Sequence, residues 1–335
     1  MQKVRLSDIA QKLGVSTVTV HNALCGRKGV SEALRGRIVQ TASEMGYQAP
    51  DGGEEKKDAP DHWDIGVVIA ENFLAQYETY YWKLYQEFAK LAAEKNCTTV
   101  VDVLKKEAER YTHEIPGALL EAEPDALAVI GEIDIGYIRM LKSRMKVPMV
   151  YIDFYNHEIA ADAVIADNFY GMYQMTELLF SCGLERLAFV GAVDAAASIM
   201  DRYLGFMRAM VIRHRTAPPE WIIRDRDEMG NLEVELPKHM PQGFVCNCDL
   251  AAEMVIDRLE AAGYRVPEDV SVAGFDNFVR KGCRKRGITT YETDRKAMVK
   301  TALDKLIKQL RTPGRKQSCQ IIPGQIRWKN SVRKI

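Results

Sequence analysis

From residue 64 onward, the chain alternates short apolar runs rich in β-branched residues with longer segments of helical periodicity. The apolar runs fall in two series, at 65–69, 98–103, 126–130 and 149–152, and then at 187–190, 244–246, 270–273 and 288–291. This alternation is typical of parallel sheets whose faces are covered by helices. Two series of similar size predict two α/β lobes, with a ligand cleft between them at the carboxyl ends of the strands.

The composition suits a folded protein that remains in water. The chain has 335 residues, of which 47% are hydrophobic and 27% charged, so it can bury a large core. No apolar run approaches the ~18 residues that span a bilayer, and the first residues lead into a polar amphipathic stretch rather than a signal peptide. We therefore expect a cytoplasmic protein without a membrane segment.

Seven cysteines are scattered along the chain, and an odd, dispersed set argues against a disulfide framework. Only Cys246 and Cys248 are close neighbours. A single C-x-C pair, without a second pair at metal-ligand spacing, is weak evidence for zinc. We interpret both as small buried residues near a strand end and expect neither a metal nor a cofactor.

The charges are balanced overall but unevenly distributed. Lys and Arg number 46, as do Asp and Glu, yet residues 1–48 carry seven basic and three acidic side chains. Residues 51–64 reverse this excess with two basic and six acidic side chains. This pattern indicates three regions: a basic head, an acidic joint that contains Gly and Pro, and a neutral body. The positive charge of the head suits it to binding nucleic acid.

The basic head has the pattern of three short helices. Ser7 can cap a first helix that ends at Gly14, and Ser16 can cap a second. A third starts at Ser31 and stops at Gly46. Two short helices joined by a turn with glycine make a helix-turn-helix, a unit that reads DNA with its second helix.

These residues resemble the N-terminal headpiece of the LacI/GalR family of bacterial transcriptional regulators. The matches, in order and spacing, are Asp8-Ile9-Ala10, Gly14-Val15-Ser16, Thr19-Val20, Val30-Ser31 and Gly46-Tyr47. The resemblance implies an all-α three-helix headpiece whose second helix lies in the major groove. It also implies a double-stranded DNA operator as partner.

The resemblance places Thr17, Val18 and Asn22 toward base edges. Asn can pair bidentately with adenine, and the methyl groups of Thr17 and Val18 can touch a thymine methyl. Ser16, Thr19 and His21 are better placed for phosphate oxygens, which fix register without reading sequence. The alternative is that His21 and Asn22 are ordinary solvated helix residues.

The head and joint also depart from the family. His21-Asn22 stands where Ser-Arg is usual, which removes the commonest guanine contact, and Cys25 stands where Asn is usual. The family joint normally folds into a hinge helix that wedges a Leu pair into the minor groove. Here residues 48–60 lack Leu and include two adjacent glycines and two prolines, which oppose helix formation. We therefore predict a flexible tether instead of a hinge helix.

The body resembles the effector-binding core of the same family, which is similar to periplasmic sugar-binding proteins. The matching stretches are Asp167-Asn168-x-x-Gly171, Arg202-x-x-Gly205-Phe206, Ile288-Thr289-Thr290 and the long run from Gly263 to Asn277. By this resemblance Arg202 and Asp276 approach the effector from one lobe, and Asn72 and Phe73 from the other. A guanidinium, a carboxylate and an aromatic face at strand ends suit polyhydroxylated ligands. The alternatives are a structural ion pair for Arg202 with Asp276 and ordinary packing for Phe73.

The resemblance implies an α/β periplasmic-binding-protein-like core of two Rossmann-like lobes. We expect the headpiece at 1–48, an acidic flexible linker at 49–63 and the effector-binding and dimerisation core at 64–335. The first lobe would comprise about 64–166 and 293–320, and the second about 167–290 and 321–335. The family's usual Asn-Asp of the cleft appears as Cys248-Asp249, so Asp249 is a candidate effector residue while nucleosides and other metabolites stay open beside a sugar.

The expected function is that of a ligand-responsive DNA-binding regulator, in the form of a homodimer on a palindromic operator. One short helix reads only a few base pairs, so two heads are needed for specificity. We find no G-x-S-x-G, G-x-x-x-x-G-K, G-x-G-x-x-G or H-E-x-x-H motif and expect no enzyme. Two alternatives remain: a ligand-binding protein with a vestigial head, and a regulator controlled by a protein partner.

Overall fold

The computed structural model describes residues 4, 6–24, 30–45, 47, 62–71, 79–112, 114–115, 117–227, 230–278 and 287–334. The chain divides into two compact units, Met1–Asp61 and His62–Ile335. Within the described ranges, no helix has both the length and the apolar character needed to cross a bilayer.

The first unit is a three-helix headpiece. Its helices are α1 (Leu6–Leu13), α2 (Thr17–Leu24) and α3 (Glu32–Glu44). Their buried side chains form one small core of Ile9, Ala10, Val20, Ala23, Ile38 and Ala42. Ser16 and Ser31 cap α2 and α3 as predicted, since their hydroxyls accept the backbone N–H of Thr19 and Leu34. The prediction for Ser7 was wrong, because α1 begins at Leu6 and Ser7 lies inside its first turn.

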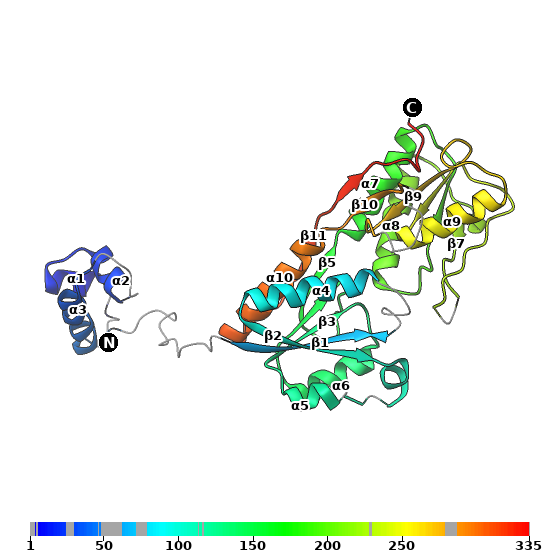
Figure 1. The fold of residues 1–335 in the computed structure, drawn as a ribbon. Helices are drawn as coiled ribbons and strands as arrows, with labels where there is room; N and C mark the ends of the chain where they lie inside the picture. Colours follow the sequence, from blue (N-terminus) through cyan, green and yellow to red (C-terminus); the bar gives the residue numbers. More distant parts are fainter. Residues whose placement is uncertain are drawn as a thin grey trace. The chain divides into compact units, whose positions relative to one another are not determined.

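The second unit contains two six-stranded sheets, one in each lobe (Figure 1). The first sheet has the order β11-β5-β4-β3-β1-β2, and all its pairs are parallel. Its strands are β1 (Trp63–Ala70), β2 (Cys97–Leu104), β3 (Ala126–Ile130), β4 (Met149–Ile152), β5 (Asp162–Ala166) and β11 (Cys319–Ile322). Because both faces are covered, strands β1, β3, β4 and β5 are almost wholly buried and read as continuous apolar runs.

Helices cover both faces of the first sheet. One face packs against α4 (Tyr80–Glu94) and α10 (Arg295–Arg311). The other face packs against α5 (Gly117–Ala122) and α6 (Ile135–Met145). A short π-helix, Ala108–Thr112, lies between β2 and α5 in the chain.

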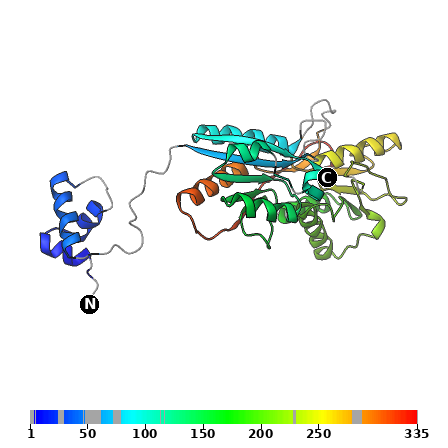
Figure 2. The same ribbon diagram turned by 90° about the horizontal axis from the view of Figure 1, so that it is seen from below.

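The second sheet has the order β12-β10-β9-β8-β6-β7, and only β12 is antiparallel to its neighbour. Its strands are β6 (Leu187–Val190), β7 (Ile222–Ile223), β8 (Gly243–Cys246), β9 (Ser271–Phe275), β10 (Thr289–Glu292) and β12 (Gln325–Arg327). The helices α7 (Asn168–Ser181) and α8 (Ala197–Ile212) pack on one face, and α9 (Asp249–Ala261) packs on the other. Figure 2 shows α9 in yellow and α8 in green on opposite sides of this sheet.

The chain crosses between the two lobes three times, after β5, after β10 and after β11. The last boundary was expected at residue 320, but β11 continues to Ile322 and the crossing follows it. The predicted fold class is confirmed: an all-α headpiece precedes two parallel α/β lobes. All eight predicted strands are present, whereas β5, β7, β11 and β12 were missed. Strand β7 has only two residues, and β11 and β12 are largely exposed sheet edges, but β5 is buried inside its sheet and as long as the predicted β3.

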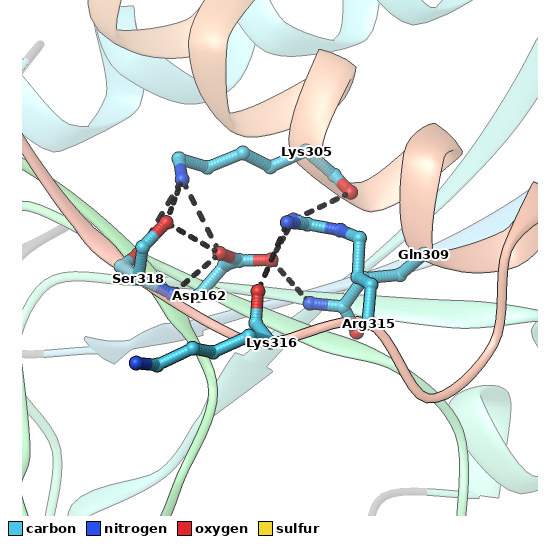
Figure 3. Close-up of polar contacts among 6 residues, drawn as sticks. All are labelled: Asp162, Lys305, Gln309, Arg315, Lys316 and Ser318. Carbon is cyan, nitrogen blue, oxygen red and sulfur yellow. Dashed lines mark hydrogen bonds and ion pairs between the residues drawn. The ribbon is translucent and has the colours of Figure 1, made fainter.

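The buried carboxylate of Asp162 connects three segments of the first lobe through hydrogen bonds and ion pairs (Figure 3). Asp162 begins β5, is fully buried and binds Lys305 Nζ at 3.2 Å and the Ser318 N–H at 3.0 Å. It also accepts hydrogen bonds from Gln309 and Arg315. Burial acts to raise the pKa of Asp162, but these hydrogen bonds and the Lys305 charge hold it below its usual range. The cluster therefore joins β5, α10 and the segment before β11.

Two single-residue interpretations concern the second lobe. Trp221 is buried, and its indole N–H donates to the His239 carbonyl at 2.8 Å, in agreement with a core position. Cys246 is buried at the end of β8, and Cys248 follows it at the start of α9. Among the described residues, no group of three or more His, Cys, Asp or Glu side chains forms a metal-binding cluster.

Candidate functional site

The predicted DNA-contacting residues lie on or beside α2. Thr17 and His21 are exposed, and Asn22 is half-buried. Val20 and Ala23 point into the headpiece core, so the opposite side of α2 remains for a partner. The side chain of Val18 lies outside the described residues.

Two of the residues assigned to phosphate also have a structural role. The hydroxyls of Ser16 and Thr19 lie 2.8 Å apart, and the Ser16 hydroxyl also accepts the Thr19 N–H. The far end of α2 is held by Arg35, which donates to the carbonyl of Ala23 at 2.7 Å. Both ends of α2 are thus fixed by contacts inside the headpiece, which sets the direction of the helix and of its exposed face.

In the core, Arg202 of α8 is the centre of a buried polar group. Its Nε–H donates to Asn168 Oδ1 at 2.8 Å, and one terminal nitrogen donates to the Asn247 carbonyl at 2.7 Å. The other terminal nitrogen lies 3.2 Å from Asp276 Oδ1. The guanidinium also stacks on Phe275, 4.1 Å from the ring centre. The structure therefore brings the predicted pair of Arg202 and Asp276 together.

Asp276 follows directly after β9, at the carboxyl end of the second sheet. Its φ of +90° places it in a backbone region that L-residues rarely adopt, and it is only 7% exposed. Burial raises its pKa, although the guanidinium of Arg202 acts to lower it. The Asp276 carboxylate is therefore fixed in position, but its Oδ1 has no hydrogen-bond partner among the described residues.

A second carboxylate comes from the first lobe, and sequence reasoning missed it. Asp153 follows β4, has a φ of +69° and is 3% exposed. Its Oδ2 accepts the Tyr81 hydroxyl at 3.0 Å, whereas its Oδ1 has no hydrogen-bond partner among the described residues. Burial raises the pKa of Asp153 to about 7, opposed by Arg202 and reinforced by Asp276. Its place directly after a predicted strand was the signal that could have found it.

Asp249, the remaining predicted carboxylate, is the first residue of α9. Its Oδ2 accepts the N–H of Phe278 at 2.9 Å. A Cβ placed on Gly274 would lie 2.0 Å from Asp249 Oδ1, so only glycine fits beside it. Burial raises its pKa well above the usual range. These contacts tie α9 to β9 and to the backbone that follows it.

Asn247 is a further buried residue that the sequence analysis did not select. Its side-chain N–H groups donate to Asp225 at 2.7 Å and to the Val190 carbonyl at 3.1 Å. Because its own carbonyl accepts from Arg202, it supports the guanidinium from the end of β8. The two predicted residues of the first lobe, Asn72 and Phe73, lie outside the described residues, as do residues 49–61 of the linker predicted at 49–63. The last residue of that predicted linker, Trp63, already belongs to β1.

Two family models match the chain. "Bacterial regulatory proteins, lacI family" matches residues 5–50, and "Periplasmic binding protein-like domain" matches residues 176–332. Among curated relatives, the HTH-type transcriptional repressor PurR of Aliivibrio fischeri (strain ATCC 700601 / ES114) is 23% identical over 314 residues, 91% of each chain. PurR of Photobacterium profundum is 24% identical over 320 residues, 91% of this chain and 92% of its own.

Solved structures show the same fold. The lac repressor dimer bound to operator and the anti-inducer ONPF matches with a TM-score of 0.66 and 18% identity, over 98% of this chain and 99% of the other. The complex of the transcriptional regulator CelR with cellobiose matches with a TM-score of 0.65 and 16% identity, over 98% and 100%. A LacI family regulator from Enterococcus faecium with bound ribose gives 0.63 and 19%, over 81% and 99%.

Proposed function

Because this chain belongs to the LacI/GalR family of bacterial transcriptional regulators, we propose that it represses transcription as a homodimer on a palindromic operator, under the control of a small metabolite bound between its lobes. Its curated relatives are DNA-binding repressors rather than enzymes. We propose three features of this regulator: the dimer, the palindromic operator and the metabolite. A sugar is the first candidate for the metabolite.

The observation that carries the proposal is the buried pair of Arg202 and Asp276, together with the buried Asp153 of the other lobe. Asp276 directly follows β9 and Asp153 directly follows β4, so each carboxylate lies at the carboxyl end of its sheet. The guanidinium offers donors in a fixed fork, and the carboxylates offer acceptors. Aromatic side chains, Tyr81 and Phe275, contact these charged groups. Donors, acceptors and ring faces together suit a polyhydroxylated ligand.

A ligand at this position would contact both lobes at once. It can bind one relative arrangement of the lobes more tightly than another, and it then shifts the population toward that arrangement. If the two arrangements hold the two heads of a dimer at different spacings, DNA affinity changes by the same differential free energy. We assign base-edge contacts to Thr17, Val18 and Asn22, and phosphate contacts to Ser16, Thr19 and His21.

The DNA-binding part is tested by selecting duplexes from a random library with the full chain and measuring affinity for the enriched sequence. We expect a palindrome, with log affinity falling steeply as log salt rises. The variant Asn22→Ala should weaken binding to the enriched site by about 10- to 100-fold. Gln40→Ala, which truncates an exposed residue on the outer face of α3, is the matched control and should bind normally. A full chain that shows no preference between a palindrome and random fragments would indicate a vestigial head.

The ligand part is tested by thermal shift with a panel of neutral sugars and nucleosides. A ligand that binds the native core raises Tm, because it adds RT ln(1 + L/Kd) to the free energy of unfolding, where L is the concentration of free ligand. The same compound should then change the affinity for the selected operator. A compound that raises Tm without changing operator affinity would contradict the proposed control of DNA binding.

A further inference from the structure

The helix that carries Arg202 lacks a capping side chain of its own. The residue before α8 is Ala196, which makes no side-chain cap. Four other long helices of the core are capped by the residue that precedes them, namely Thr79 for α4, Asp134 for α6, Asp167 for α7 and Asp294 for α10, whereas α9, like α8, has no side-chain cap. The first N–H groups of a helix have no partner within it, so α8 needs an acceptor from elsewhere.

The acceptor comes from the opposite lobe. Glu132, which follows β3 in the first lobe, accepts the N–H of Ala197 through Oε2 at 2.7 Å. Its position is fixed on both sides, since Gly131 donates to the Ile152 carbonyl at 2.9 Å and Ile133 is buried. A negative charge at a helix N-terminus is also favourable, because the aligned peptide dipoles place partial positive charge there.

A second contact between the lobes reaches the same helix. The hydroxyl of Tyr155, from the segment after β4, donates to Asp201 Oδ1 at 3.4 Å. Asp201 is the residue before Arg202 in α8. Two side chains of the first lobe, Glu132 and Tyr155, therefore contact the first half of α8, at Ala197 and Asp201.

We propose that Glu132 is a positioning residue that caps α8 across the two lobes and thereby holds Arg202 in place only while the lobes are closed. Separation of the lobes breaks the bond to Ala197, and the first turn of α8 then loses its acceptor. Closure and the orientation of the Arg202 guanidinium are coupled through this single carboxylate. The coupling does not depend on which ligand the protein binds.

The test is hydrogen–deuterium exchange on the full chain, wild type against Glu132→Ala. Loss of a capping acceptor should speed exchange of the first amides of α8, residues 197–200, by about fivefold. The matched control is Glu158→Ala, which removes an exposed carboxylate whose partner, Arg139, lies in the same lobe. This control should leave α8 at the wild-type rate. Unchanged exchange at 197–200 in Glu132→Ala, or faster exchange spread evenly over both lobes, would overturn the proposal.

Two further readouts separate positioning from general stability. Glu132→Gln retains an oxygen acceptor with the same reach, so it should restore most of the protection of α8 that Glu132→Ala loses. The ¹⁵N–¹H signal of Arg202 Nε, which donates to Asn168, should shift in Glu132→Ala and return toward its native position in Glu132→Gln. An Arg202 signal that is the same in all three proteins would also count against the proposal.

Discussion

Two buried aspartates of the first lobe, Asp153 and Asp162, stand at opposite ends of the segment that joins β4 to β5. Asp162 at the start of β5 accepts hydrogen bonds from Lys305, Gln309, Arg315 and Ser318. Asp153 at the end of β4 accepts one from Tyr81 and keeps one oxygen without a partner among the described residues. The pKa of Asp162 is lowered, whereas that of Asp153 is raised to about 7.

The contrast separates a structural carboxylate from one available to a ligand. A buried carboxylate whose acceptor positions are filled by cations and N–H groups stabilises the fold. A buried carboxylate that is only partly satisfied costs free energy, and such groups concentrate at functional sites. Asp153 lies at the carboxyl end of its sheet, where α/β proteins bind ligands, and Asp162 lies at the amino end.

The largest expected effect is the loss of the Asp162 cluster. Asp162→Ala leaves Lys305 and Arg315 largely buried without a counter-charge, and we expect it to lower the free energy of unfolding by about 3–5 kcal/mol. Urea unfolding at pH 7 measures this loss. Asp304→Ala, which removes a more exposed carboxylate paired with Lys95 and Lys300, should cost less than about 1 kcal/mol. Equal losses of stability in Asp162→Ala and Asp304→Ala would show that the buried Asp162 cluster stabilises the fold no more than an exposed ion pair does.

A smaller effect of opposite sign is expected at Asp153, and it depends on pH. Its folded pKa of about 7 exceeds the ordinary value, so the unfolded chain loses this proton first as pH rises. The wild type therefore loses stability between about pH 4 and pH 7, a loss that Asp153→Asn avoids. We expect the variant to be more stable than the wild type at pH 8, by on the order of 2–4 kcal/mol, and to have little advantage at pH 4.

Unfolding of both proteins by urea across this pH range checks the Asp153 prediction. The contribution of Asp162 runs in the other direction, because its lowered pKa means that stability is lost as pH falls. A stability difference between wild type and Asp153→Asn that stays constant with pH would show that Asp153 does not titrate with folding.

The smallest expected effect comes from Tyr81, the hydroxyl donor to Asp153. Tyr81→Phe should destabilise the protein by about 1–2 kcal/mol at pH 8, where Asp153 is ionised, and by less at pH 5.5. Tyr151→Phe is the control, since the hydroxyl of Tyr151 donates to the Ile159 carbonyl, a group that does not titrate. Its cost should be the same at both pH values, and a matching pH-independent cost for Tyr81→Phe would contradict the role assigned to this contact.

Much of the architecture could be predicted because it rests on local patterns. The caps at Ser16 and Ser31 and the eight predicted strands follow from residue type and spacing over a few positions. Arg202 and Asp276 were selected through the family resemblance, and the structure brings them to within 3.2 Å. Strand β11 was missed, because its pairing partner β5 lies far away in the chain.

A helix-turn-helix head followed by two parallel α/β lobes can be predicted from the amino-acid sequence alone, since hydrophobic period and helix capping are properties of short segments. Which buried carboxylates have hydrogen-bond partners depends instead on tertiary contacts. Asp153 and Asp162 are alike in sequence context, each beside an apolar strand, and differ because distant residues of α10 surround one and not the other. In the same way, Glu132 became the cap of α8 through a contact that spans 65 positions of the chain and joins two lobes.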